Sequence, residues 1–108
     1  MDRAEEQPGE DLRIEALSIK KAALILRSVN HTFRQKILSL MHEQGRMTVT
    51  QLFIQLRMEQ SITSQHLAIL RRARIVRAER DGKHIYYSIN YDQLIHVQEV
   101  AKRLGALR

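Results

Sequence analysis

One stretch of the chain places short polar side chains and a cation at helical spacing. Ser64, Gln65, Ala68 and Arg72 follow Ser61 by three, four, seven and eleven residues, so in a helix all five share one face. Small side chains let a helix approach the floor of a DNA major groove, Ser and Gln can bond base edges, and Arg can bond a phosphate or a guanine. The face favours double-stranded DNA as a partner; a plain solvated helix surface is the alternative.

Positive charge is concentrated directly after this face. Residues 71–83 hold two carboxylates, Glu79 and Asp81, and six cations: Arg71, Arg72, Arg74, Arg77, Arg80 and Lys83. Long cations beside a turn at Asp81–Gly82 can straddle a DNA backbone or enter a minor groove. A turn that is charged only for solubility is the competing explanation.

Size and charge limit the possible classes of function. A chain of 108 residues has room for one domain. The net charge is +6, but residues 1–15 carry six acidic and two basic side chains, which leaves +10 on the remainder. Such a basic body attracts nucleic acid or an anionic membrane surface, and solubility or a protein partner could also account for it. The chain has no Cys and no apolar run of about 20 residues, so we expect a cytoplasmic protein without disulfides and without membrane contact.

Apolar periodicity places these side chains on a series of helices and one hairpin. It predicts helices over residues 12–29, from 33 to near 45, 48–57, 61–73 and 91–104, the third opening with a Thr48–Gln51 capping box. β-Branched and aromatic runs at 75–79 and 84–89 predict a β-hairpin in which Ile85, Tyr87 and Ile89 face inward. The fold class is mainly α with a β-hairpin wing, a winged helix-turn-helix over residues 12–108, preceded by a flexible acidic arm at 1–11.

The last predicted helix is too apolar on one side for the surface of a small domain. We expect this stripe to pack against its mate in a homodimer, together with apolar residues of the first helix. Packing within one subunit is the alternative. The predicted dimer interface is Ile14, Leu17, Leu24, Leu94, Val97, Ala101 and Leu104.

Three segments, taken in order, resemble the ArsR/SmtB-like repressors of bacteria. Residues 30–38 are similar to the second-helix signature of that family, 64–71 to its recognition-helix core and 76–89 to its wing, and the resemblance covers about residues 14–104. It implies a dimer packed through the first and last helices, binding to an imperfect inverted repeat, and repression relieved by a ligand. Ser61, Ser64, Gln65 and His66 match positions that the family uses at the groove. With the turn and flanking residues, the predicted DNA contacts are Gln60, Ser61, Thr63, Ser64, Gln65, His66, Arg71, Arg72, Arg80, Lys83 and His84.

The chain also departs from the family pattern. Thr48–Val49–Thr50 stands where many members have Cys-x-Cys, and Tyr91 and Gln93 replace an Asp-x-His pair, so we predict no metal and no cofactor. Thr32 stands where Pro is usual. Arg74 replaces a usual Gly before the first strand, which raises the question of how tight that turn is.

The remaining polar residues form no recognisable catalytic set. His96 and Glu99 are spaced for half a metal site, a spacing that exposed helix pairs also show. The basic body contains no Gly-rich phosphate loop, no ordered Ser, His and carboxylate, and no paired carboxylates, so we predict that the protein is not an enzyme. The expected partners are double-stranded DNA, a second copy of the chain and an unidentified small-molecule inducer. A winged-helix module whose basic face binds an acidic protein is the alternative function.

Overall fold

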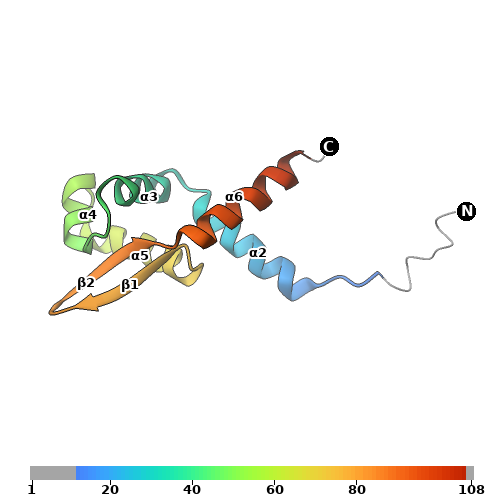
Figure 1. The fold of residues 1–108 in the computed structure, drawn as a ribbon, viewed down its shortest axis with the longest axis horizontal. Coiled ribbons are helices and arrows are strands. Elements are labelled where there is room, and N and C mark those ends of the chain that lie inside the picture. Colours follow the sequence, from blue (N-terminus) through green and yellow to red (C-terminus); the bar gives the residue numbers. More distant parts are fainter. Residues whose placement is uncertain (1–11, 107–108) are drawn as a thin grey trace, which may run out of the picture.

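Within residues 12–106, the part of the chain that the computed structural model describes, five helices and two strands follow one another. They are α2 (Ala16–Val29), α3 (Thr32–Gln44), α4 (Val49–Leu56), α5 (Gln60–Arg72), β1 (Val76–Asp81), β2 (His84–Ile89) and α6 (Tyr91–Ala106) (Figure 1). This order confirms the predicted winged helix-turn-helix. The arm predicted for residues 1–11 lies outside the described residues. None of the helices in the described part is long and apolar enough to cross a membrane.

The helix-turn-helix is formed by α4 and α5, and its start is fixed by the predicted capping box. The Thr48 hydroxyl accepts a hydrogen bond from the Gln51 backbone N–H (3.2 Å), and the Gln51 side chain accepts one from the Thr48 N–H (2.9 Å). These two bonds satisfy donors that a helix end otherwise leaves free. At the other end, Arg57 adopts a left-handed conformation with φ of 57°, which stops α4 three residues before α5 begins.

The core lies where α3, α4, α5, the base of the hairpin and α6 meet. Its fully or nearly buried apolar residues are Ile37, Leu38, Met41, Met47, Leu52, Leu67, Leu70, Ala73, Ile75, Val76, Ile89 and Val97. Burial of this apolar surface is the main force that holds α5 and the hairpin in place.

The first helix is shorter than predicted. It begins at Ala16 rather than at residue 12, and its N-cap Glu15 makes no side-chain capping bond. Leu12 and Ile14 are each 68% exposed. No part of the described chain covers these two side chains, so a helix extended over residues 12–15 would bury no apolar surface to offset its entropy cost. The apolar spacing of these residues therefore does not produce a helical turn.

The hairpin pairs β1 with β2 in antiparallel register, and its base is held by an extra bridge. Asp81 faces His84, so the two turn residues are Gly82 and Lys83, one position later than predicted, and Gly82 supplies the positive φ of 68°. Met47 exchanges backbone hydrogen bonds of 2.9 and 2.7 Å with Tyr87.

One prediction about the hairpin was wrong. Ile89 is buried and Tyr87 is half-buried, as expected for inward positions, but Ile85 is 44% exposed. Ile85 pairs with Arg80 near the turn. Figure 1 shows that this end of the hairpin extends past the helices, so no core lies beneath it.

The turn between α5 and β1 is tight although it lacks the glycine. Arg74 takes a left-handed conformation with φ of 63°. Its N–H donates to the Arg71 carbonyl and the Ile75 N–H donates to the Leu70 carbonyl, both at 2.9 Å. The backbone hydrogen bonds of the turn are therefore made. The unfavourable part is the crowding of the Arg74 Cβ atom against the backbone in this conformation.

Candidate nucleic-acid interface

The polar face predicted for α5 is turned toward solvent. Seven of its side chains are exposed: Gln60, Ser61, Ser64, Gln65, Ala68, Arg71 and Arg72. The opposite side of the helix is held in the core by Leu67 and Leu70, which are at most 1% exposed. Because the apolar side is anchored, the exposed side is presented at a fixed angle. The result is a small, uncharged ridge with cations at its C-terminal end, which can fit a major groove.

Thr63 does not belong to this ridge, and its prediction as a DNA contact was wrong. Its side chain is fully buried, and its hydroxyl donates a hydrogen bond to the Glu59 carbonyl at 3.0 Å. Thr63 is two positions from Ser61 and four before Leu67, so it lies on the core side of the helix.

His66 lies at the edge of the ridge, half-buried, and faces α3. Its Nδ1 is 3.1 Å from a terminal nitrogen of Arg34. Its ring centroid is 4.7 Å from that of His31 and 4.9 Å from that of Phe33. Burial first, and then the nearby charges of His31 and Arg34, lower the pKa of His66 below its ordinary value of 6.5.

Arg34 connects three helices, a role that the sequence patterns did not reveal. It lies on α3 with only 9% of its surface exposed, and burial lowers its pKa. Its Nε donates to the Ser28 carbonyl at 2.6 Å and a terminal nitrogen donates to the Arg27 carbonyl at 3.3 Å, both in the last turn of α2. The sequence signal for this role was that Arg34, a charged residue, lies three positions before the apolar Ile37 and so on the same side of the helix.

The cations predicted at the turn are exposed at the tip of the hairpin. Arg80, Lys83 and His84 all reach solvent there. Figure 1 shows the hairpin projecting from one end of the molecule, while α2 and α6 extend at the other. A partner that contacts both this tip and the exposed side of α5 must reach from one to the other, and a DNA duplex is long enough to do so.

Arg46 adds to this surface and was not predicted. Its guanidinium forms a 2.8 Å salt bridge with Asp81 and lies 4.0 Å from the ring centroid of Tyr86. The hydrogen bond with Asp81 raises the pKa of Arg46. The pair balances the carboxylate charge beside the turn, so Arg80 and Lys83 leave the tip positively charged.

The residues predicted for dimerisation fall into two groups. Leu17 is 66% exposed, Leu24 42% and Leu104 54%, and Ile14 and Ala101 are exposed as well. Leu94, by contrast, is only partly exposed because it packs against the core.

Val97 is 6% exposed and belongs to the core of its own subunit, so its placement at a dimer interface was wrong. The face of α6 that packs against the core is centred on Val97 and not on the opposite side of the helix, as the predicted dimer interface required. Its exposed apolar residues are Tyr91 and Ile95, at 45% and 54%, and on α2 Ile19 is 59% exposed. The sequence analysis did not single out Tyr91 and Ile95, because it assigned the apolar residues of α6 to one stripe, whereas the helix has an inner and an outer apolar side.

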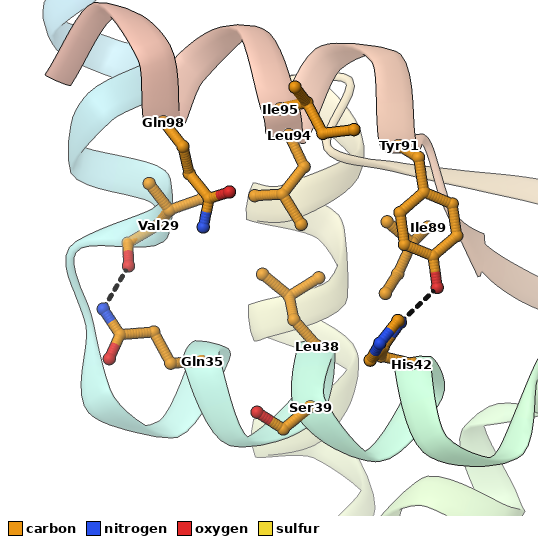
Figure 2. A pocket seen from close by; sticks show the side chains of 10 residues that line it. All are labelled: Val29, Gln35, Leu38, Ser39, His42, Ile89, Tyr91, Leu94, Ile95 and Gln98. Atoms are coloured by element: carbon orange, nitrogen blue, oxygen red, sulfur yellow. Dashed lines mark hydrogen bonds between the residues drawn. The ribbon is translucent and has the colours of Figure 1, made fainter. Parts of the chain in front are cut away.

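A hollow of about 500 Å³ lies between α3 and α6. Figure 2 shows Leu38 and Leu94 pointing toward one another across it, with Ile89 beside them. At one end, His42 Nδ1 and the Tyr91 hydroxyl are 2.7 Å apart and hydrogen-bonded. None of the side chains that line the hollow is an acid, a Lys or an Arg. It suits a small, largely apolar molecule with one hydrogen-bonding group.

Between residues 12 and 106, no three His, Asp or Glu side chains come together closely enough to hold an ion.

Comparison with known proteins identifies relatives that cover most of this chain. Residues 33–78 match the family model described as bacterial regulatory protein, arsR family. The transcriptional repressor PagR of Bacillus anthracis is 36% identical over 80 residues, which make up 74% of this chain and 80% of PagR. The crystal structure of PagR matches with a TM-score of 0.63, covering 80% of this chain and 99% of that chain.

Two further relatives extend the comparison. The HTH-type transcriptional regulator MJ1325 of Methanocaldococcus jannaschii is 35% identical over 88 residues, 82% of this chain and 96% of MJ1325. A homodimeric winged helix-turn-helix DNA-binding domain from Mycobacterium bovis, Mb0332, has a TM-score of 0.72 at 23% identity, covering 90% of this chain and 91% of that chain. This last likeness supports the fold.

Proposed function

Because this chain belongs to the arsR family of bacterial regulatory proteins, we propose that it represses transcription by binding an inverted-repeat DNA operator as a homodimer. Membership makes it a DNA-binding transcription regulator and not an enzyme, and it disfavours a module that binds only acidic proteins. The sense of regulation is proposed from PagR, which is named a transcriptional repressor. We place the protein in the cytoplasm, where bacterial DNA lies.

The observation that carries the proposal is the exposed ridge of α5 together with the charged hairpin. We assign Ser61, Ser64 and Gln65 to base edges in the major groove. The flanking DNA contacts are assigned to Gln60, Arg71 and Arg72 on α5, and to Arg80, Lys83 and His84 at the hairpin tip. His66, which the sequence predicted as a further contact, faces α3 and bonds Arg34, so we do not assign it to DNA. In a symmetric dimer the two α5 helices would enter successive major grooves, about 34–36 Å apart.

A second copy of the chain accounts for the apolar surface on α2 and α6. Leu17 and Ile19 on α2 and Ile95 on α6 are each more than half exposed. Exposed apolar residues gathered on two elements indicate an interface, because soluble monomers seldom leave large apolar patches in water. Mb0332, which shares this fold, is named as a homodimer.

We place an inducer in the hollow between α3 and α6. A molecule there would contact α3, which packs against α5, and α6, which carries part of the proposed dimer surface. It could therefore change the spacing of the two α5 helices.

The side chains that line the hollow favour an uncharged ligand, so p-cresol is a suitable first probe. It should raise the melting temperature of the protein but not of a Ser39→Trp variant, which introduces a large side chain among the residues that line the hollow. Equal shifts in both proteins would place the binding elsewhere.

The decisive experiment selects bound sequences from a random duplex library and measures their affinity by fluorescence anisotropy. We expect an inverted repeat, with binding that weakens steeply as salt increases, because phosphate contacts release counterions. Gln65→Ala should relax the preference at one position in each half-site by about tenfold. Gln44→Ala is the matched control, since Gln44 bonds Gln55 and is not among the residues that we assign to DNA. Selection without any enriched sequence would contradict the proposal.

A further inference from the structure

We propose that the hydrogen bond from Arg34 to His66 fixes the orientation of α5 for base recognition and makes the DNA sequence preference of this protein depend on pH. The inference rests on the proposed function of α5 as the recognition helix. In this account Arg34 and His66 are positioning residues.

The geometry of Arg34 ties the recognition helix to the rest of the fold. From α3 its guanidinium donates to two carbonyls at the C-terminal end of α2 and to His66 on α5, 32 residues away in sequence. The carbonyl end of a helix carries partial negative charge, which favours a cation there. The partners in these bonds are two carbonyls and one imidazole, with no carboxylate among them. Of these three partners, only the imidazole of His66 belongs to α5, so this bond is the one that joins Arg34 to the recognition helix.

This attachment requires a neutral imidazole. A guanidinium can only donate, so Nδ1 of His66 must accept, and the proton of the neutral ring must be on Nε2. If Nδ1 gains a proton, the acceptor is lost and two cations face each other across the 3.1 Å contact. The bond between α3 and α5 then becomes a repulsion.

Among residues 12–106, no anion faces His66 to offset that charge. The titratable and charged groups that face it are Arg34 on α3 and His31 at the N-cap of α3. Phe33 contributes an uncharged ring. On α5 itself, the residues three and four positions away are uncharged: Ile62, Thr63, Ile69 and Leu70. Acid therefore places positive charge beside positive charge at this junction.

The direction of the pH effect follows from the lowered pKa of His66. The folded protein holds this proton less tightly than the unfolded chain does. The stability that the contact contributes is therefore complete above the unfolded pKa near 6.5 and is lost as the pH falls through the folded pKa. Over the same range the added charge strengthens attraction to any DNA, while the loosened α5 weakens base contacts. The ratio of specific to non-specific affinity should therefore fall on acidification.

The test measures that ratio by anisotropy at pH 7.5 and pH 5.5, with the selected duplex and a scrambled duplex of equal length at constant ionic strength. For the wild-type protein we expect the ratio to fall at least about fivefold at pH 5.5, the scale of losing a hydrogen bond to a charged group. In His66→Gln the amide oxygen can accept the same bond and does not titrate, so the ratio should remain high at both pH values. In His66→Leu the ratio should be low at both.

Two other histidines serve as controls. His42→Gln, on α3 and hydrogen-bonded to Tyr91, should keep the wild-type pH dependence. His84→Gln, at the hairpin tip, should change the affinity for both duplexes alike. A wild-type ratio that does not change with pH, or an equal fall in His66→Gln, would overturn the inference and leave the proposed function intact. Absence of any specific binding at pH 7.5 would instead count against the proposed function.

Discussion

Replacing Arg74 by glycine should stabilise the protein. Arg74 occupies the left-handed region at φ of 63°, where a Cβ atom crowds the following carbonyl and costs about 1–2 kcal/mol. Glycine removes this strain but increases the entropy of the unfolded chain by about 0.4–1 kcal/mol. The net gain should be about 0.5–1 kcal/mol, which for a domain of this size raises the melting temperature by about 2–4 °C.

The backbone bonds of this turn do not depend on the side chain. Those made by Arg74 N–H and by its carbonyl, which accepts from Asn90 at 3.0 Å, remain in every variant. Arg74→Ala is therefore the matched control, since it removes the charge but keeps the Cβ. Its free energy of unfolding should stay near wild type. Arg74→Asn should lie between the alanine and glycine variants, because Asn tolerates the left-handed region better than most residues.

Urea unfolding at one fixed protein concentration measures this series, because the stability of a dimer depends on concentration. The urea midpoint should increase in the order Ala, Asn, Gly with a constant slope. Equal midpoints for the glycine and alanine variants would show that position 74 is not strained and would refute the reasoning.

Three further changes test the dimer, the hairpin and the helix cap. Leu17→Asp should convert the dimer to monomers in light scattering and weaken operator binding, whereas Ile54→Asp, at an equally exposed residue on α4, should leave the dimer intact. Lys83→Ala should weaken binding to all DNA sequences alike and lower the salt slope by about one per site, whereas Lys102→Ala, on the far end of α6, should not. Thr48→Ala should lower the free energy of unfolding by about 1 kcal/mol in urea, because it removes the cap of α4; no change would mean that this cap is not needed.

Local sequence patterns predicted most of the helices and the hairpin. The Thr48–Gln51 cap, the α5 ridge and the pairing of 84–89 with the preceding strand all depend on residues a few positions apart. Periodicity of 3.6 or 2 residues therefore identifies such elements without knowledge of their neighbours. The errors at Thr63 and Ile85 have the opposite origin. Thr63 is polar but lies on the core side of its helix, and Ile85 is apolar but lies beyond the end of the core, so residue type and exposure disagree at both.

The sequence by itself determined the order of the helices, the hairpin and the polar face that we assign to DNA, because these depend on the spacing of residue types along a short segment. Only the tertiary structure decided that Val97 belongs to the core of its subunit and that Arg34 joins α2 to α5 through His66. Contacts between residues 32 positions apart depend on how helices pack against one another, and the rotation of each helix is set by its neighbours and not by its own periodicity.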